Sequence, residues 1–152
     1  THLDDNRYDN DLDIVIQRAK QEGVESFIIP GADPKTLKKA LNIAQKYDDV
    51  YFAVGVHPYD ASNYDRDFLE HFITHPKCVA VGECGLDYYR LPEDEGKVAK
   101  EKALQKEVFL DQIDLANKYN KPLIVHIRDA SSDSLEILQS HTPKRGGVLH
   151  CY

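Results

Sequence analysis

Apolar residues recur at helical spacing in two stretches near the start of the chain. They stand at positions i, i+3, i+4 and i+7 within residues 12–19 (Leu12, Val15, Ile16, Ala19) and within residues 37–44 (Leu37, Ala40, Leu41, Ala44). This spacing places the apolar side chains on one face of a helix. The pattern predicts two amphipathic helices there, and we expect further helices over residues 65–72, 100–119 and 133–139.

Short apolar runs rich in β-branched and aromatic residues separate these stretches and are typical of strands. They occupy residues 24–31, 50–58, 78–81, 122–129 and 146–152. Strands that alternate with helices over short connections form βαβ units, which build a parallel sheet with right-handed crossovers. The pattern therefore predicts an α/β fold. Because no Pro/Gly/Ser-rich linker divides the chain, we expect residues 1–152 to form a single domain.

Length and charge narrow the functional classes. The chain has 152 residues, enough to bury a core, and its 19 basic and 26 acidic side chains give a formal charge of −7. A broad basic face that holds nucleic acid by charge alone is therefore not expected. The three cysteines show no C-x-x-C spacing, which favours free thiols in a reducing compartment. No apolar stretch approaches the roughly 20 residues of a membrane span, so we predict a soluble, cytoplasmic protein without a membrane partner.

Residues that bind metals stand at the ends of four of the apolar runs. Three runs end in His57, His126 and His150, the fourth ends in Glu83 between two glycines, and His2 has a similar position near the start. In a parallel sheet the carboxyl ends of the strands converge on one face. A single histidine at such a position is more often a hydrogen-bonded structural residue than a ligand. Four imidazoles and a carboxylate together are the ligand set of a divalent metal, so the set predicts a metal centre.

Other chemistries have weaker support in the sequence. Cys151 and His150 resemble a nucleophile and its base, but adjacent residues on a strand point to opposite faces. No G-x-S-x-G, G-x-G-x-x-G or Walker sequence is present.

We expect residues 85–97 to form a long loop directly after Glu83. In this loop Tyr88 and Arg90, together with Arg128 elsewhere in the chain, are candidates for aromatic and cationic contacts to substrate. Simple packing of Tyr88 and its neighbour Tyr89 is an equally open interpretation.

Five motifs in order resemble the TatD-type metal-dependent deoxyribonuclease family. They are "THLDD", "GVHP", "GECGLDYYR", "PLIVHIRDA" and "HCY", and they span the whole chain. The resemblance implies a parallel (β/α)8 TIM-like barrel of the metal-dependent hydrolase type. It also implies hydrolysis of phosphodiester bonds in DNA, commonly from the 3′ end and on single strands.

The same resemblance implies roles for individual residues. Glu83 would bridge two divalent metal ions (Mg, Mn or Zn), His126 and His150 would bind one of them, and His2 would belong to the other. Glu83, His126 and His150 would thus be the catalytic set, with His57 and Arg128 near the substrate. Oligomeric state is left open.

Departures from the family pattern leave alternatives open. The Asp and first His of the opening motif and a late Asp ligand have no counterpart in this chain. A complete barrel also needs roughly 250 residues, so we expect an incomplete barrel that lacks its first residues and its C-terminal βα units. One alternative is a related barrel hydrolase acting on ester or amide bonds, such as those of D-aminoacyl-tRNA. The other is a homologue that binds nucleic acid without cleaving it.

Overall fold

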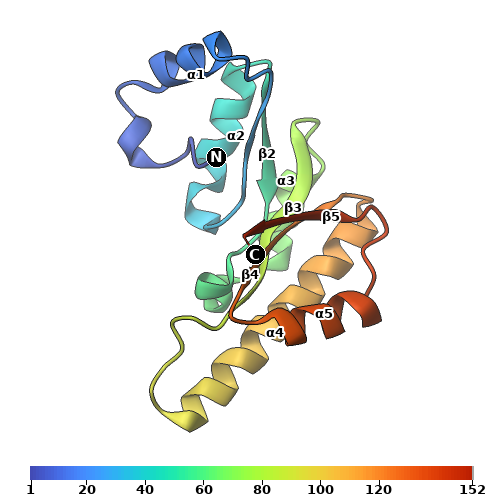
Figure 1. Ribbon diagram of the computed structural model, residues 1–152. Helices are drawn as coiled ribbons and strands as arrows, with labels where there is room; N and C mark the ends of the chain where they lie inside the picture. The colour runs from blue at the N-terminus through green and yellow to red at the C-terminus, as the bar shows by residue number, and fades with distance from the viewer. Residues whose placement is uncertain (152) are drawn as a thin grey trace.

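Five parallel strands form one sheet, in the order β1-β2-β3-β4-β5, in the computed structural model, which describes residues 1–151. The strands are β1 (Phe27–Ile29), β2 (Val50–Val54), β3 (Cys78–Asp87), β4 (Leu123–Arg128) and β5 (Gly147–Cys151). Neighbours in the sheet are neighbours in the chain, and every pair is parallel. The strands curl into part of a barrel (Figure 1). This confirms the predicted α/β, TIM-barrel-like fold class.

The first helix precedes β1, and each of the other four connects two successive strands. They are α1 (Leu12–Gln21), α2 (Leu37–Lys46), α3 (Arg66–Ile73), α4 (Glu95–Lys118) and α5 (Ser131–Ser140), with short 3-10 helices η1 (Asn6–Tyr8), η2 (Pro34–Thr36) and η3 (Pro58–Asn63). In Figure 1, α1 and α2 lie at the β1–β2 end of the sheet, and α4 and α5 lie at the opposite end. Among residues 1–151, no helix is both long and apolar enough to cross a membrane.

The main core lies between the sheet and the helices. Phe52 of β2, Leu86 of β3 and Phe109 of α4 are fully buried in it. The opposite face of the sheet carries a small second cluster of Ala53, Ala80 and Ile124. Burial on both faces explains why β2 and β3 read as almost continuous apolar runs rather than as alternating patterns.

Element boundaries differ from the sequence prediction at three places. β3 continues through Glu83 to Asp87, so the following loop is shorter than expected. β2 ends at Val54, and His57 instead caps the 3-10 helix η3 by accepting a hydrogen bond from the backbone of Tyr59. α4 begins at Glu95 because the Asp94 side chain accepts a hydrogen bond from the Lys97 backbone N–H and caps the helix. An apolar pattern does not detect these boundaries, because β3 contains polar residues and the first turn of α4 is charged.

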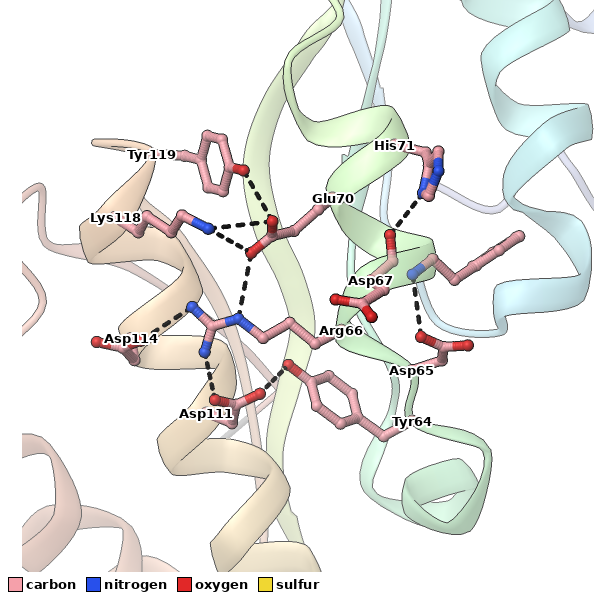
Figure 2. Close-up of polar contacts among 11 residues, drawn as sticks. Tyr64, Asp65, Arg66, Asp67, Glu70, His71, Asp111, Asp114, Lys118 and Tyr119 are labelled. Carbon is pink, nitrogen blue, oxygen red and sulfur yellow. Dashed lines mark hydrogen bonds and ion pairs between the residues drawn. The ribbon is translucent and has the colours of Figure 1, made fainter.

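A polar network joins α3 to α4 (Figure 2). Arg66 contacts Glu70 (3.2 Å), Asp114 (2.9 Å) and Asp111. Glu70 also accepts hydrogen bonds from Lys118 (2.8 Å) and from the Tyr119 hydroxyl (3.0 Å). A carboxylate with three donors is held more firmly than one in an isolated surface ion pair, because several charges share one geometry.

Replacing Glu70 by Gln should weaken the pH dependence of stability in acid. The hydrogen bond from Lys118, opposed by partial burial, lowers the pKa of Glu70 from 4.5 to about 2. A lowered folded-state pKa stabilises the protein above the unfolded value of 4.5, and this contribution is lost as pH falls toward about 2. Thermal unfolding of wild type and Glu70→Gln across this window should converge, with the exposed Glu136→Gln as control. A constant difference at every pH would contradict the assignment.

Candidate metal centre

Two glycines let β3 approach β4 at the position of the candidate metal ligands. Gly82 and Gly85 have φ angles of 141° and 136°, and the Gly82–Glu83 peptide bond is cis. A Cβ added to Gly85 would lie 2.0 Å from the carbonyl oxygen of His126, and one added to Gly82 would lie 2.3 Å from that of Ile124. The glycines beside Glu83 therefore permit a close backbone approach that brings β3 against the strand carrying His126.

Glu83, Asp87 and His126 form the buried centre of the site. The Nδ1 atom of His126 lies 3.0 Å from Oε1 of Glu83, and its Nε2 atom lies 2.7 Å from Oδ2 of Asp87. Their exposed fractions are 5%, 1% and 7% for Glu83, Asp87 and His126. Each ring nitrogen of the histidine thus faces a different carboxylate, and the two acids come from one strand, four residues apart.

His57 completes a cluster with metal-ligand spacing. One potential ligand atom each from His57, Glu83 and His126 lies within 4.8 Å of the others. The rings of His57 and His126 have centroids 4.4 Å apart. His57 Nδ1 accepts a hydrogen bond from the Tyr59 backbone N–H (3.1 Å), so in the neutral ring the proton lies on Nε2 and a metal bound there would displace it. The residue expected only to lie near substrate therefore stands among the candidate ligands.

His2 approaches Glu83 from the other side. Its Nε2 atom is 4.0 Å from Oε2 of Glu83, and its Nδ1 atom is 3.9 Å from Oδ1 of Asp4. Asp4 is 5% exposed and accepts a 2.5 Å hydrogen bond from Thr36 at Oδ2, while its Oδ1 atom has no hydrogen-bond partner among the described residues. A buried, unpartnered carboxylate oxygen beside a histidine is suited to orienting that histidine or to facing a cation.

The remaining sequence candidates lie around this cluster in different ways. His150 is exposed on β5, near enough to Glu83 for its charge to favour the ionised carboxylate, but it is not in the cluster of ligand atoms. Arg128 ends β4 and Arg90 lies in the loop after β3, each beside a tyrosine ring. Tyr88 is partly buried and donates its hydroxyl hydrogen bond to Asp133 of α5 (2.7 Å), so its side chain packs toward the helix layer.

Sequence reasoning assigned no role to four polar residues that support the site. They are Asp4, Asp87, Gln105 and Gln112, all at most 5% exposed. Gln112 accepts from the backbone N–H of Val56 (2.9 Å) and donates to its carbonyl (3.1 Å), beside His57. Gln105 accepts from the backbone N–H of Asp87 (2.9 Å). The sequence does contain a signal for the two glutamines: they stand seven residues apart within the apolar stripe of a predicted helix.

Comparison with known proteins identifies the family. A family model described as "TatD related DNase" matches residues 1–152. The chain belongs to the TatD family.

TatD relatives resemble the chain over nearly all of its length. It is 40% identical to "Uncharacterized metal-dependent hydrolase YabD" of Bacillus subtilis (strain 168), covering 99% of this chain and 58% of that protein. It is 32% identical to "3'-5' ssDNA/RNA exonuclease TatD" of Shigella flexneri serotype 5b, covering 99% of this chain and 57% of that protein. The crystal structure of YjjV, a TatD homologue from Escherichia coli K12, superimposes with a TM-score of 0.85 at 29% identity, covering 99% of this chain and 57% of YjjV. The chain thus spans somewhat over half the length of these relatives.

Charge in the TatD site follows from its hydrogen bonds. Burial opposes the charge on His126, but its hydrogen bonds with Glu83 and Asp87 outweigh this and raise its pKa above 6.5. Burial likewise opposes ionisation of the two acids, while the bonds with His126 hold the pKa of each carboxyl below its ordinary value. The pKa of His57 is lowered by burial and by the nearby His126. The site therefore holds two carboxylates and a neutral His57 near neutral pH.

The donor set of the TatD site fits a divalent metal ion. Neutral imidazoles and carboxylates are the ligands that Zn²⁺ and Mn²⁺ share, and carboxylates also serve Mg²⁺. The unpartnered Oδ1 atom of Asp4 and the paired carboxylates leave negative charge that a cation would offset. His57, Glu83 and His126, with His2 on the far side of Glu83, are the residues that would hold the ions.

Metal binding to the TatD site should release protons and weaken in acid. The pKa of His126 is raised, so below it the imidazole carries a proton that a metal must displace. Affinity should therefore fall as pH decreases through that pKa. Calorimetric titration with Mn²⁺ between roughly pH 5 and 8, in buffers of different ionisation enthalpy, measures both effects. His126→Asn should remove the proton release, whereas His141→Asn, on an exposed residue, should retain it. Equal affinity at every pH would contradict this prediction.

Proposed function

We propose that the protein is a metal-dependent phosphodiesterase that removes nucleotides from the 3′ ends of single-stranded DNA. The observation that carries this proposal is the position of Glu83. Its Oε1 atom faces His126 and its Oε2 atom faces His2, so the two oxygens of one buried carboxylate face histidines from two different segments. This arrangement supports a carboxylate that bridges two cations. The name of the Shigella flexneri relative, a 3'-5' ssDNA/RNA exonuclease, supports the substrate class.

Glu83, His126, His57 and His2 would hold divalent ions, which would supply charge to polarise a phosphoryl oxygen and to activate water for in-line attack. The protein's side chains would hold the ions and orient the ligand groups. In the proposed site, Glu83 offsets the charge of both ions, and the side of His126 that faces Glu83 supplies the ligand nitrogen. The other ring nitrogen donates to Asp87, which fixes the orientation of the ring and makes the ligand more basic.

His57 has a second suitable role at this position. The pKa of His57 is lowered by burial and by His126, so its ring is neutral near neutral pH. Because Nδ1 accepts from Tyr59, Nε2 carries the proton and can donate it to a phosphate oxygen, or lose it when a metal binds. His150 on β5 is exposed beside the cluster, and we propose that it joins the ligands when a metal is bound.

The experiment is release of labelled nucleotide from single-stranded DNA by the complete protein. We expect release from a 3′-labelled strand before a 5′-labelled one, loss of release with EDTA, and recovery with Mg²⁺, Mn²⁺ or Zn²⁺. An RNA strand of the same sequence measures selectivity for the sugar. Activity that survives EDTA, or uniform internal cleavage of the strand, would overturn the proposal.

A further inference from the structure

Two tyrosines at the edge of the site are attached to the same carboxylate that orients His126. The Tyr59 hydroxyl donates to Oδ1 of Asp87 (2.9 Å), and the backbone N–H of Tyr89 donates to the same oxygen (3.0 Å). The other oxygen of Asp87 contacts His126 at 2.7 Å. The ring of Tyr59 also lies 5.0 Å from that of His57, measured between centroids. Both tyrosines are thus fixed relative to the metal-binding residues.

Both rings are presented to solvent. Tyr59 is 39% exposed and Tyr89 is 56% exposed, whereas the intervening Tyr88 packs inward with its hydroxyl on Asp133. Tyr59 and Tyr89 therefore expose ring surface while each is hydrogen-bonded to Asp87, Tyr59 through its hydroxyl and Tyr89 through its backbone N–H. Exposed aromatic rings held by the same carboxylate of a polar site are more typical of a binding surface than of a core.

Arginines accompany both rings. The guanidinium carbon of Arg128 lies 3.5 Å from the centroid of the Tyr89 ring, and that of Arg90 lies 5.8 Å from the centroid of the Tyr59 ring. These arginines bring positive charge to a chain whose formal charge is −7. Because the chain carries net negative charge, local cations and aromatic contacts must add to the attraction that the proposed metal ions would exert on a nucleic acid.

We propose that Tyr59 and Tyr89, which we call the tyrosine platform, stack on unpaired nucleobases next to the scissile phosphodiester, and that Arg90 and Arg128 contact the phosphates. This inference rests on the proposed function and specifies its substrate: strands whose terminal bases are free to unstack. Aromatic rings stack on every base, so the platform selects unpaired bases without selecting sequence. In a duplex the base faces are already stacked, and the platform gains nothing from them.

Binding of a short phosphorothioate single strand tests the platform without cleavage. Tyr89→Ala should weaken binding about ten-fold, within the range for loss of one base–aromatic stack. Tyr89→Phe keeps the ring and the backbone N–H that bonds to Asp87, so it should bind as wild type does. Tyr51→Ala is the matched control, because Tyr51 carries Lys77 over its ring (4.7 Å) in β2 and lies away from the cluster.

A second strand with abasic residues at its 3′ end isolates the base contact. Wild type should bind it at least about ten-fold more weakly than the base-bearing strand, and Tyr89→Ala, which keeps only the Tyr59 ring, should show a clearly smaller difference between the two strands. On cleavable strands the variant should raise KM for the base-bearing strand and leave kcat close to wild type.

The outcomes separate the platform from the proposed hydrolysis. Base-dependent binding through Tyr89 in a protein that cleaves no DNA would support the platform and overturn the nuclease. Metal-dependent cleavage with equal affinity of wild type and Tyr89→Ala for both strands would support the nuclease and overturn the platform.

Discussion

Glu83→Gln should give a folded protein with reduced metal content and with hydrolysis lower by several powers of ten. Two cations on one carboxylate repel each other, and an amide cannot supply the charge that offsets this repulsion. Stability should change much less, because Gln has nearly the same shape, leaves no cavity and can still form a hydrogen bond with His126. Metal stoichiometry, thermal unfolding and nuclease rate should be measured on the same preparation.

The control for this variant is Glu107→Gln, which makes the same chemical change on the exposed surface of α4. It should retain metal, stability and rate. If Glu83→Gln kept full metal content and full activity, Glu83 would be a structural carboxylate and the proposed site would fail.

Gly85→Ala should disrupt the pairing of β3 with β4 at the site and destabilise the protein. The new Cβ would lie 2.0 Å from the carbonyl oxygen of His126, and the residue would keep a φ of 136°, which side chains other than that of glycine rarely adopt. Backbone strain alone costs about 1–3 kcal/mol, and separating the paired strands adds to it. We expect a loss of more than about 3 kcal/mol in the free energy of unfolding, measured with urea.

Gly96→Ala provides the matched comparison. Gly96 lies in the first turn of α4, where a Cβ would meet only the Asp94 side chain at 3.3 Å. Ala favours a helix over Gly by roughly 0.5–1 kcal/mol, so the net change should be small. Similar losses for the two variants would show that the close approach of β3 to β4 is not what requires Gly85.

Most of the fold could be predicted from apolar patterns, because β2, β3 and β4 are buried along nearly their whole length and the helices present apolar side chains to them. The C-terminal end of β3 and the first residues of α4 could not be predicted in this way. β3 keeps its pairing through Glu83 and Asp87 because His126 on the adjacent strand compensates two buried charges, and no single-strand pattern carries that information.

The candidate site was predictable only where a ligand residue followed an apolar run. Glu83, His57 and His126 met that criterion, and the structure brings them within ligand distance of one another. Asp87 stood within the quoted motif but received no role, because its partner is a histidine 39 residues away. The sequence alone could not distinguish Tyr88 from Tyr89. The turn that follows β3 exposes the ring of Tyr89, while the hydroxyl of Tyr88 bonds to Asp133.

The side chain of Gln112 acts as a substitute peptide group. Its amide accepts from the N–H and donates to the C=O of the same residue, Val56, as an adjacent strand would, although it comes from a helix. Asn is one methylene too short for this task, Glu lacks the donor, and Leu leaves both backbone groups unpaired. Position 112 should therefore accept very few amino acids. A library randomised at this buried helix position and selected for metal-dependent activity should return glutamine, although residue 112 is not among the candidate metal ligands.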